Sequence, residues 1–363
     1  MKFERVRLAA IGGLVPDEVW SSNDIEQRLQ PLYSRLKLPE GRLELMSGIR
    51  ERRVWSPGTV PSGPSIECGK LALEASGIDA SNVGALIHAS VCRDFLEPAT
   101  ASRVHDGIGL PNDCWVYDIS NACLGIINGA VQIASLIEAG VISAGIVVGT
   151  ENSRMLLEST LQSLNADESL TRKNIKGAFA SLTIGSGSCA WLLSHESLAP
   201  EAASIDAAVA EAYTTHHQLC VSDSDSAGAG MQPLMETDSE TLMAEGIRAG
   251  VAAFSKLMCD CETRPEDVAR SVCHQVGVRH QAAMLEAMGL SKELDSISYP
   301  QLGNTGSVAL PLTLSLAAVR GELPAGGRVA MCGIGSGINS VMMMARWGET
   351  RIAGNVRQLV ETA

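Results

Sequence analysis

The same order of elements occurs twice along the chain. In each half an apolar helical stretch is followed by an apolar strand, then by the tetrapeptide IGSG and a second apolar strand. The tetrapeptides occupy residues 184–187 and 334–337 of a 363-residue chain. Such a repeat predicts one α/β unit that is used twice. The first copy contains an additional segment, residues 151–182, which we interpret as an insertion.

Apolar strand-like stretches alternate with helical patterns in both halves. Strands are expected at 8–15, 85–90, 145–149, 271–275 and 328–332, and helices at 123–139, 279–288 and 306–320. The first of these helices places Leu124, Ile127 and Val131 on one face, and Gly140 ends it. This alternation predicts an α/β fold with mostly parallel, buried strands.

The composition supports a large core and argues against a polyanionic partner. Apolar residues make up 45% of the chain, aromatic residues only 4%. The formal charge of −13 repels polyphosphate at long range, so nucleic acid is not an expected partner. Any anionic ligand therefore needs a local cluster of basic side chains.

Two apolar stretches raise the question of targeting or membrane insertion. Residues 8–15 precede Pro16 and Asp17 without a convincing cleavage site, so we interpret them as a strand and not as a signal peptide. Residues 329–347 are nearly free of charge, but glycines, serines and an asparagine lie at their centre. Two buried strands joined by a tight turn explain this segment better than a membrane span.

The ten cysteines and seven histidines show no metal-binding spacing. Cys259 and Cys261 form only C-x-C in an acidic context, so zinc is not predicted. His216 and His217 are adjacent, do not share a face, and lack a third ligand. Many free thiols indicate a reducing compartment and hence a cytoplasmic location.

Cys123 stands where the first long apolar helix is expected to begin. A helix N-terminus presents unpaired N–H groups and partial positive charge, which stabilise a thiolate and also an oxyanion formed by attack on a carbonyl. The alternative is an inert buried thiol, which is common among cysteines.

Two polar residues of the second half occupy comparable places. His274 lies at the end of a predicted strand, where α/β sheets bind ligands, and a neutral imidazole there serves acid–base chemistry or hydrogen bonding. Asn304 precedes the second apolar helix and is the counterpart of Cys123. The alternatives are a core histidine and a plain helix cap. We expect the three side chains to converge between the halves.

These stretches resemble the thiolase superfamily, most closely its ketoacyl synthase III-like condensing enzymes. The resemblance is carried by SGIRERR at 47–53, DISNACLG at 118–125, HQ at 274–275, GNTG at 303–306 and GIGSG at 333–337. It implies a duplicated thiolase-like fold of five layers, αβαβα. The halves would be residues 1–195, with the nucleophile Cys123, and residues 196–363, with His274 and Asn304.

A further stretch, residues 90–102, resembles a loop of the OleA-type enzymes, which condense two acyl-CoA molecules head to head in bacterial olefin biosynthesis. RLQPLYSRL at 28–36 and the Asn-Ala-Cys form of the nucleophile motif are similar to the same subfamily. In that type a glutamate, Glu97 here, enters the site of the neighbouring subunit, which implies a homodimer. A solvated surface role is the alternative for Glu97.

The resemblance implies a ping-pong Claisen condensation of fatty acyl-CoA to a long-chain β-keto acid, with no cofactor beyond the CoA thioesters. Cys123 would form an acyl-enzyme, which a carbanion from a second acyl-CoA attacks. His274 and Asn304 would bind the thioester oxygen, and the N–H groups of Cys123 and Ser336 would form a second oxyanion hole.

The donor decides whether a base is needed. A malonyl donor makes its carbanion by losing CO₂, whereas a plain acyl-CoA must lose a weakly acidic α-proton to a positioned base, the role implied for Glu97. If Glu97 is a solvated residue, a ketoacyl synthase III-like enzyme with a malonyl donor or another acceptor is the alternative. A non-catalytic partner subunit is a third interpretation, against which the complete Cys/His/Asn set argues.

Arg50, Arg52 and Arg53 are the candidates for binding the phosphates of CoA, because their run forms a local basic patch in an acidic chain. The alternative is an ordinary solvated basic run. The expected partners are acyl-CoA substrates, a second copy of the chain and downstream pathway enzymes.

Overall fold

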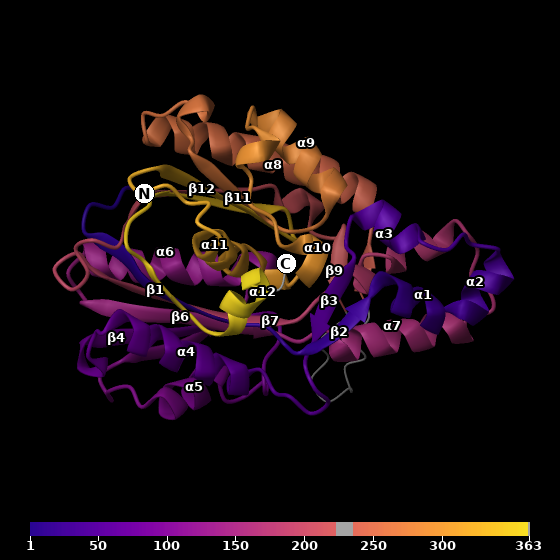
Figure 1. The fold of residues 1–363 in the computed structure, drawn as a ribbon, viewed down its shortest axis with the longest axis horizontal. Coiled ribbons are helices and arrows are strands. Elements are labelled where there is room, and N and C mark those ends of the chain that lie inside the picture. Colours follow the sequence, from indigo (N-terminus) through magenta and orange to yellow (C-terminus); the bar gives the residue numbers. More distant parts are fainter. Residues whose placement is uncertain (223–234, 362–363) are drawn as a thin grey trace.

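The structure is a computed structural model that describes residues 1–222 and 235–361. Sheets and helices alternate in layers, as Figure 1 shows. From one side to the other lie the helices α4 (Ser62–Ser76) and α5 (Thr100–Ile108), a sheet region, α6 (Gly125–Glu138) with α11 (Ala309–Val319), a second sheet region, and α8 (Ser239–Asp260) with α9 (Val278–Met288). This is the expected thiolase-like, five-layer arrangement, and the main apolar core surrounds α6 and α11.

Strand order shows the duplication directly. The first half contributes β1 (Val6–Leu14), β4 (Val83–Ala89), β5 (Trp115–Ile119), β6 (Ala144–Glu151) and β7 (Gly187–His195); the second contributes β8 (Ala203–Ala212), β11 (Arg270–Cys273), β12 (Arg328–Gly335) and β13 (Asn339–Arg346). Their order is β11-β12-β13-β8-β1-β7-β6-β4-β5. The set β4, β6, β7, β1 and the set β11, β12, β13, β8 share one pattern: a parallel pair followed by two antiparallel pairs. The copies meet where β1 pairs with β8.

The prediction of mostly parallel strands is wrong, although the strands are buried as expected. Antiparallel pairs join β6 to β7, β7 to β1, β12 to β13 and β13 to β8. The reason is clear between β12 and β13, because a connection of only three residues allows an antiparallel pair alone. These two strands account for the uncharged stretch 329–347, as predicted. No helix in residues 1–222 and 235–361 has both the length and the apolarity needed to cross a bilayer.

Both helices that carry candidate residues begin with a tight turn. The helix predicted at 123–139 starts as a 3-10 turn at Ala122–Leu124, continues as α6, and is followed by Gly140 at φ +69°. The helix predicted at 306–320 likewise starts as a 3-10 turn at Gly306–Val308 and continues as α11. The two copies of the unit therefore share this detail.

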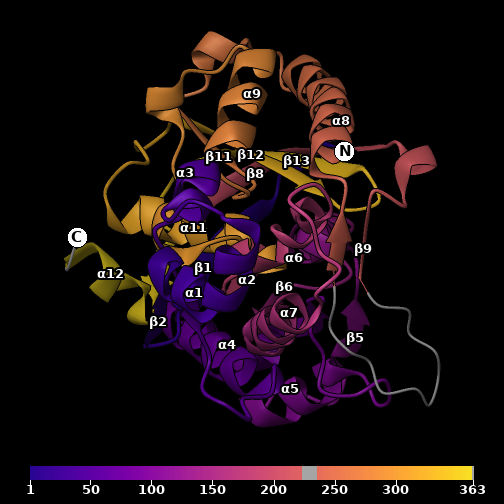
Figure 2. The same cartoon turned by 90° about the vertical axis from the view of Figure 1, so that its right-hand side faces the viewer.

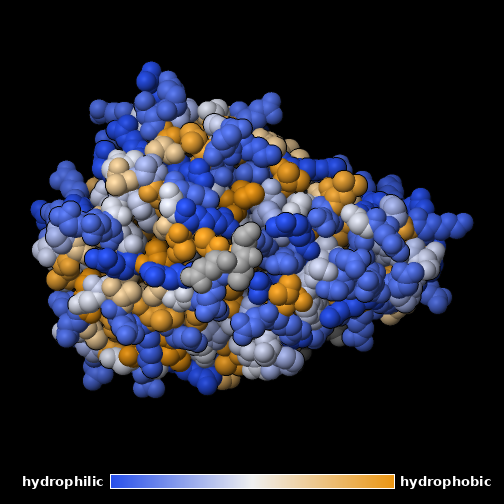
Figure 3. Space-filling view, viewed as in Figure 1, coloured by the Kyte–Doolittle hydropathy of each residue, from blue (hydrophilic) through white to orange (hydrophobic). Residues whose placement is uncertain are grey.

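The insertion 151–182 packs with an N-terminal segment as a lobe beside the layers. Figure 2 shows α1 (Ser22–Arg28), α2 (Gln30–Leu36) and α7 (Arg154–Ala166) together on this side, and α3 (Arg42–Ser47) lies near them. Trp20, Leu32, Leu157 and Phe179 belong to a hydrophobic cluster of this lobe alone. The remaining strands and α-helices of the described residues are β2 (Glu18–Ser21), β3 (Glu51–Val54), β9 (Cys220–Ser222), β10 (Met235–Thr237), β14 (Arg351–Ala353), α10 (Tyr299–Leu302) and α12 (Gln358–Glu361). On the face in Figure 3, hydrophobic side chains form separate patches among hydrophilic ones.

Candidate active site

Cys123 lies in the Ala122–Leu124 turn between β5 and α6. Ala122 has a φ of +44°, in the left-handed region that side-chain-bearing residues rarely adopt. The turn packs against the second IGSG segment, since a Cβ added to Gly335 would lie 3.6 Å from the Cys123 nitrogen. A backbone held in this region marks a turn whose geometry the surrounding structure imposes, as is common at functional sites.

Asn304 precedes the Gly306–Val308 turn, which contacts the Cys123 turn. The Asn304 N–H donates to the Thr183 carbonyl (2.9 Å), and the Asn304 carbonyl accepts from the Gly185 N–H (2.9 Å). Its side-chain Oδ1 accepts from the Gly306 N–H at 3.0 Å, an Asx turn that resembles the cap we considered. Hydrogen bonds of the backbone and of Oδ1 thus fix the orientation of the Asn304 side-chain amide.

His274 directly follows β11, as predicted, and only 7% of it is exposed. The backbone N–H of His274 donates to the Cys332 carbonyl (3.0 Å), so His274 is held against β12. Strand β12 in turn contacts the Cys123 turn. Burial lowers the pKa of His274 to about 3, with a further contribution from His280, so the imidazole is neutral near pH 7. The structure thus joins the elements that carry Cys123, His274 and Asn304.

The Cys123 thiol is protonated in the free protein. Burial is the main cause that raises its pKa to about 12, and the nearby Glu151 carboxylate and Cys220 contribute in the same direction. The expected thiolate at the helix mouth is therefore wrong for the resting site, because loss of hydration outweighs the field of the helix end. The thiol has to lose its proton during attack on a substrate.

This raised pKa predicts the pH dependence of Cys123 alkylation. Because the thiolate is the reactive form and pH 7–10 lies below about 12, iodoacetamide labelling should rise about tenfold per pH unit throughout this range. An ordinary thiol levels off near pH 9, since its pKa is about 8.5. Peptide mass spectrometry of the labelled protein measures the rate at Cys123, and a plateau below pH 9 would contradict the prediction.

Glu97 lies in an exposed loop between β4 and α5. Val91, Phe95 and Leu96 of the same loop are 48%, 52% and 54% exposed. Apolar side chains gathered on one surface loop indicate a contact surface. Among the residues that the structure describes, Glu97 is exposed to solvent.

The loop lies beside β5, the last strand of the sheet among residues 1–222 and 235–361. This strand is at the outer side of the molecule in Figure 2, and its Trp115 is 60% exposed. An exposed edge strand offers free backbone groups to another chain. The edge and the loop together form one surface suited to a partner.

Ser336 lies in the turn between β12 and β13 and is partly exposed. It follows Gly335, which packs against the Cys123 turn, and precedes Gly337 and Ile338, with φ of +80° and +55°. The second IGSG segment is thus a tight turn beside the turn that carries Cys123.

The predicted arginine patch is wrong for Arg52. Arg50 is exposed, but Arg52 is 0% exposed, and its guanidinium donates to the Trp20 carbonyl and to Ser22 Oγ, both at 3.1 Å. Burial lowers its pKa to about 10. Arg53 is partly buried, with Nη2 3.8 Å from Glu51 Oε1. Residues alternate between the faces of a strand, so neighbours in β3 do not form one patch.

Arg52 is therefore expected to act in folding. Arg52→Ala removes a buried side chain and its hydrogen bonds to the Trp20 carbonyl and Ser22 Oγ, so the free energy of unfolding should fall by about 2–4 kcal/mol. Arg50→Ala, the exposed control, should change it by no more than about 0.5 kcal/mol. Urea unfolding followed by circular dichroism measures both, and equal effects would refute the structural role.

Glu151 is the site residue that sequence reasoning missed. It is the last residue of β6, is 5% exposed, and lies close enough to Cys123 to affect its pKa. The available signal was an acidic residue at the carboxyl end of the buried strand GIVVG, where α/β sheets place functional groups.

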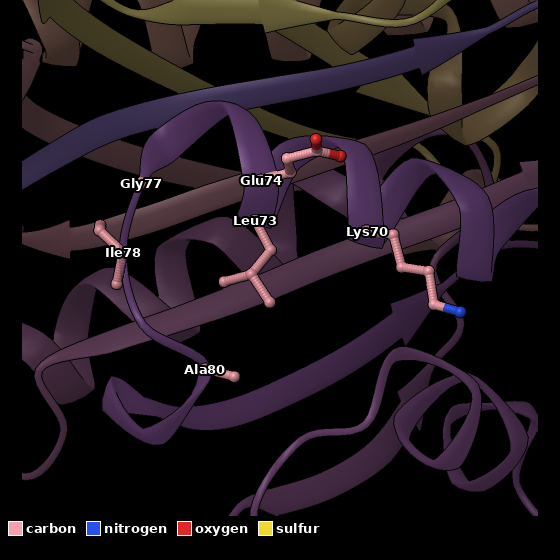
Figure 4. A pocket seen from close by; sticks show the side chains of 6 residues that line it. All are labelled: Lys70, Leu73, Glu74, Gly77, Ile78 and Ala80. Atoms are coloured by element: carbon pink, nitrogen blue, oxygen red, sulfur yellow. The ribbon is translucent and has the colours of Figure 1, made fainter.

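Other features do not join this site. His216 pairs with Glu245 (3.4 Å) and His217 is exposed; the described residues include no group of three metal-ligating side chains. A shallow cavity of about 450 Å³ lies at the end of α4. Figure 4 shows the residues that line it: Lys70, Leu73, Glu74, Gly77, Ile78 and Ala80. None of them is a candidate catalytic residue.

Comparisons with known proteins agree with one another and together cover most of the chain. The family model "3-Oxoacyl-[acyl-carrier-protein (ACP)] synthase III C terminal" matches residues 259–347. The chain is 36% identical over 351 residues to the acyl-CoA:acyl-CoA alkyltransferase of Shewanella oneidensis, covering 96% of this chain and 100% of the relative. It is 31% identical over 347 residues to that of Xanthomonas campestris pv. campestris, with 96% and 100% covered.

Solved structures extend the similarity to the fold. Cerulenin-bound Xanthomonas campestris OleA has a TM-score of 0.90 and 31% identity, with 96% of this chain and 98% of that chain covered. A cysteine-to-serine variant of the same protein, with bound lauric acid and lauroyl-CoA, has a TM-score of 0.89 and 30% identity, with 95% and 100% covered.

Proposed function

The chain belongs to the acyl-CoA:acyl-CoA alkyltransferase family, within the ketoacyl synthase III-like enzymes, and from this premise we propose that it joins two fatty acyl-CoA molecules without decarboxylation. The product is a long-chain β-keto acid. The observation that carries the proposal is the full-length identity of 36% to an acyl-CoA:acyl-CoA alkyltransferase. A ketoacyl synthase III of Koribacter versatilis, by contrast, is only 23% identical.

Acylation is the first step, and Cys123 is its nucleophile. The sulfur bonds to the thioester carbon, the bond from that carbon to the CoA sulfur breaks, and the thiol proton ends on CoA. Because the pKa of the thiol is raised to about 12, the proton has to move as the new bond forms. The neutral imidazole of His274 can relay it.

Condensation is the second step, and Glu97 is its base. The carboxylate takes an α-proton from a second acyl-CoA, and the enolate oxygen accepts hydrogen bonds from His274 and the Asn304 amide. The enolate carbon bonds to the acyl carbon, whose oxygen the N–H groups of Cys123 and Ser336 stabilise, and the bond from that carbon to the Cys123 sulfur breaks. The departing sulfur takes up a proton, which restores the thiol. Hydrolysis of the remaining thioester gives the acid.

The relatives support these roles by residue type and spacing. Xanthomonas campestris OleA has been solved as variants of one cysteine, one glutamate and one histidine. Its glutamate precedes its cysteine by the same 26 residues that separate Glu97 from Cys123.

The proposal includes a homodimer in the cytoplasm. The exposed Glu97 loop and β5, the outermost described strand of the sheet, are its contact surface, so Glu97 of one subunit completes the site of the other. Each subunit consists of two halves, 1–195 and 196–363. Of the three arginines, the exposed Arg50 is the candidate contact for CoA phosphates. All steps use side chains and backbone groups, so no cofactor is required.

Incubation of the protein with lauroyl-CoA alone tests the function. The expected result is CoA release together with a β-keto product in the absence of malonyl-CoA. A product that forms only with malonyl-CoA would favour the ketoacyl synthase III-like alternative. Failure to form an acyl-enzyme with lauroyl-CoA would favour a non-catalytic subunit.

A further inference from the structure

Glu151 is a buried carboxylate that none of the proposed steps uses. It ends β6 in the first half of the chain and is 5% exposed. We propose that Glu151 is a positioning residue that holds the Glu97 loop and the Asn304 turn in a fixed relation. This inference rests on the proposed roles of Glu97 and Asn304.

The carboxylate binds the start of the Glu97 loop. The Val91 N–H donates to Oε1 at 3.1 Å, and the Cys92 N–H donates to Oε2 at 3.4 Å. Further along, the Asp94 carboxylate accepts from the Ser62 N–H at 2.9 Å. Residues 91–94, the first part of the loop, are thus held by hydrogen bonds. Phe95, Leu96 and Glu97, which follow them, remain exposed.

The same carboxylate binds the turn after Asn304. The N–H and the hydroxyl of Ser307 both donate to Oε1, at 3.2 and 2.5 Å. Gly306 has a φ of +56°, and a Cβ there would lie 3.1 Å from the Glu151 carboxyl carbon. The glycine therefore allows the turn to approach the carboxylate closely.

These donors make the connection stiff. Glu151 receives three backbone N–H groups and one hydroxyl, from segments more than 200 residues apart in sequence. Hydrogen bonds to a charged group are strong, and a buried carboxylate without them is costly. Moving either the Glu97 loop or the Asn304 turn would break hydrogen bonds that stabilise the buried carboxylate. We therefore expect both segments to keep their positions.

Activation of the nucleophile does not explain the position of Glu151. Its negative charge raises the pKa of Cys123 and also that of Cys92, and so disfavours a thiolate. A positively charged side chain would have the opposite effect on both pKa values. The contacts with the loop and the turn are therefore the better account of its place.

Glu151→Gln tests the inference, because glutamine keeps the shape but turns one acceptor into a donor that faces the Cys92 N–H. Condensation of lauroyl-CoA should fall about tenfold or more, since a small misplacement of reacting groups is costly. Acylation of Cys123 should stay the same or become faster. Amide hydrogen exchange should accelerate in residues 90–98 and 304–308. Ser307→Ala is the milder variant, and Glu168→Gln, at an exposed glutamate, is the matched control.

The two readouts separate this inference from the proposed function. Unchanged exchange in both segments of a folded Glu151→Gln protein would overturn the positioning role, whatever the activity. Faster exchange with full condensation would also overturn it. Faster exchange with slower condensation supports it. A Glu97→Ala protein that condenses normally would instead remove Glu97 from the proposed mechanism.

Discussion

Cys123→Ala should abolish the covalent acyl-enzyme and slow condensation at least about 10³-fold, since the reaction loses its only carrier of the first acyl group. Intact-protein mass spectrometry after incubation with lauroyl-CoA measures the acyl adduct, and CoA release measures turnover. The wild-type protein should gain one acyl group per chain, and the variant should gain none.

Cys259→Ala is the control for Cys123→Ala. Cys259 is an exposed cysteine at the end of α8, outside the site, so its removal should leave the adduct intact. An adduct that persists in Cys123→Ala at any other residue would contradict the assignment of the nucleophile.

Glu97→Ala should separate the two steps of the reaction. Acylation of Cys123 by lauroyl-CoA should continue, because that step needs no α-proton removal. Condensation should fall about 10²–10⁴-fold, the usual contribution of a general base. Mass spectrometry should then show an acyl-enzyme that accumulates without a β-keto product. Full condensation activity would show that another group removes the proton.

Mixed dimers test whether Glu97 acts across the interface. A dimer of one Cys123→Ala subunit and one Glu97→Ala subunit has one site with both functional groups if Glu97 serves its partner. Co-expression should therefore restore about a quarter of wild-type activity, because half of the dimers are mixed and each has one complete site. If Glu97 served its own chain, the mixture would stay as inactive as either variant alone.

Local patterns were sufficient for most of the fold. The strand stretches at 85–90 and 145–149 correspond to β4 and β6, and the stretch 329–347 is the predicted pair of strands. The repeated element order also led to the duplicated fold. Strand direction was missed, because apolar runs show that a strand is buried but do not show which neighbour it pairs with. Helix α7 of the insertion was not predicted either, because its many polar residues make the apolar periodicity weak.

Individual site residues also differ in how far the sequence predicted them. Cys123, His274 and Asn304 were singled out by their places at helix starts and a strand end, which are local features. The protonation of Cys123 was predicted wrongly, because the pKa of a thiol depends on burial and on charges from distant segments such as Glu151. Arg52 was taken for a surface residue, although strand alternation turns it inward.

The amino-acid sequence by itself determined the repeated unit, the helix and strand positions and the set of reactive side chains, because these depend on residue type and spacing within short segments. Only the tertiary structure decided the strand directions, the neutral state of the thiol and the contacts of Glu151 with Val91 and Ser307. These properties arise from groups far apart in the chain, whose hydration and electrostatic energies are set only when folding brings them together.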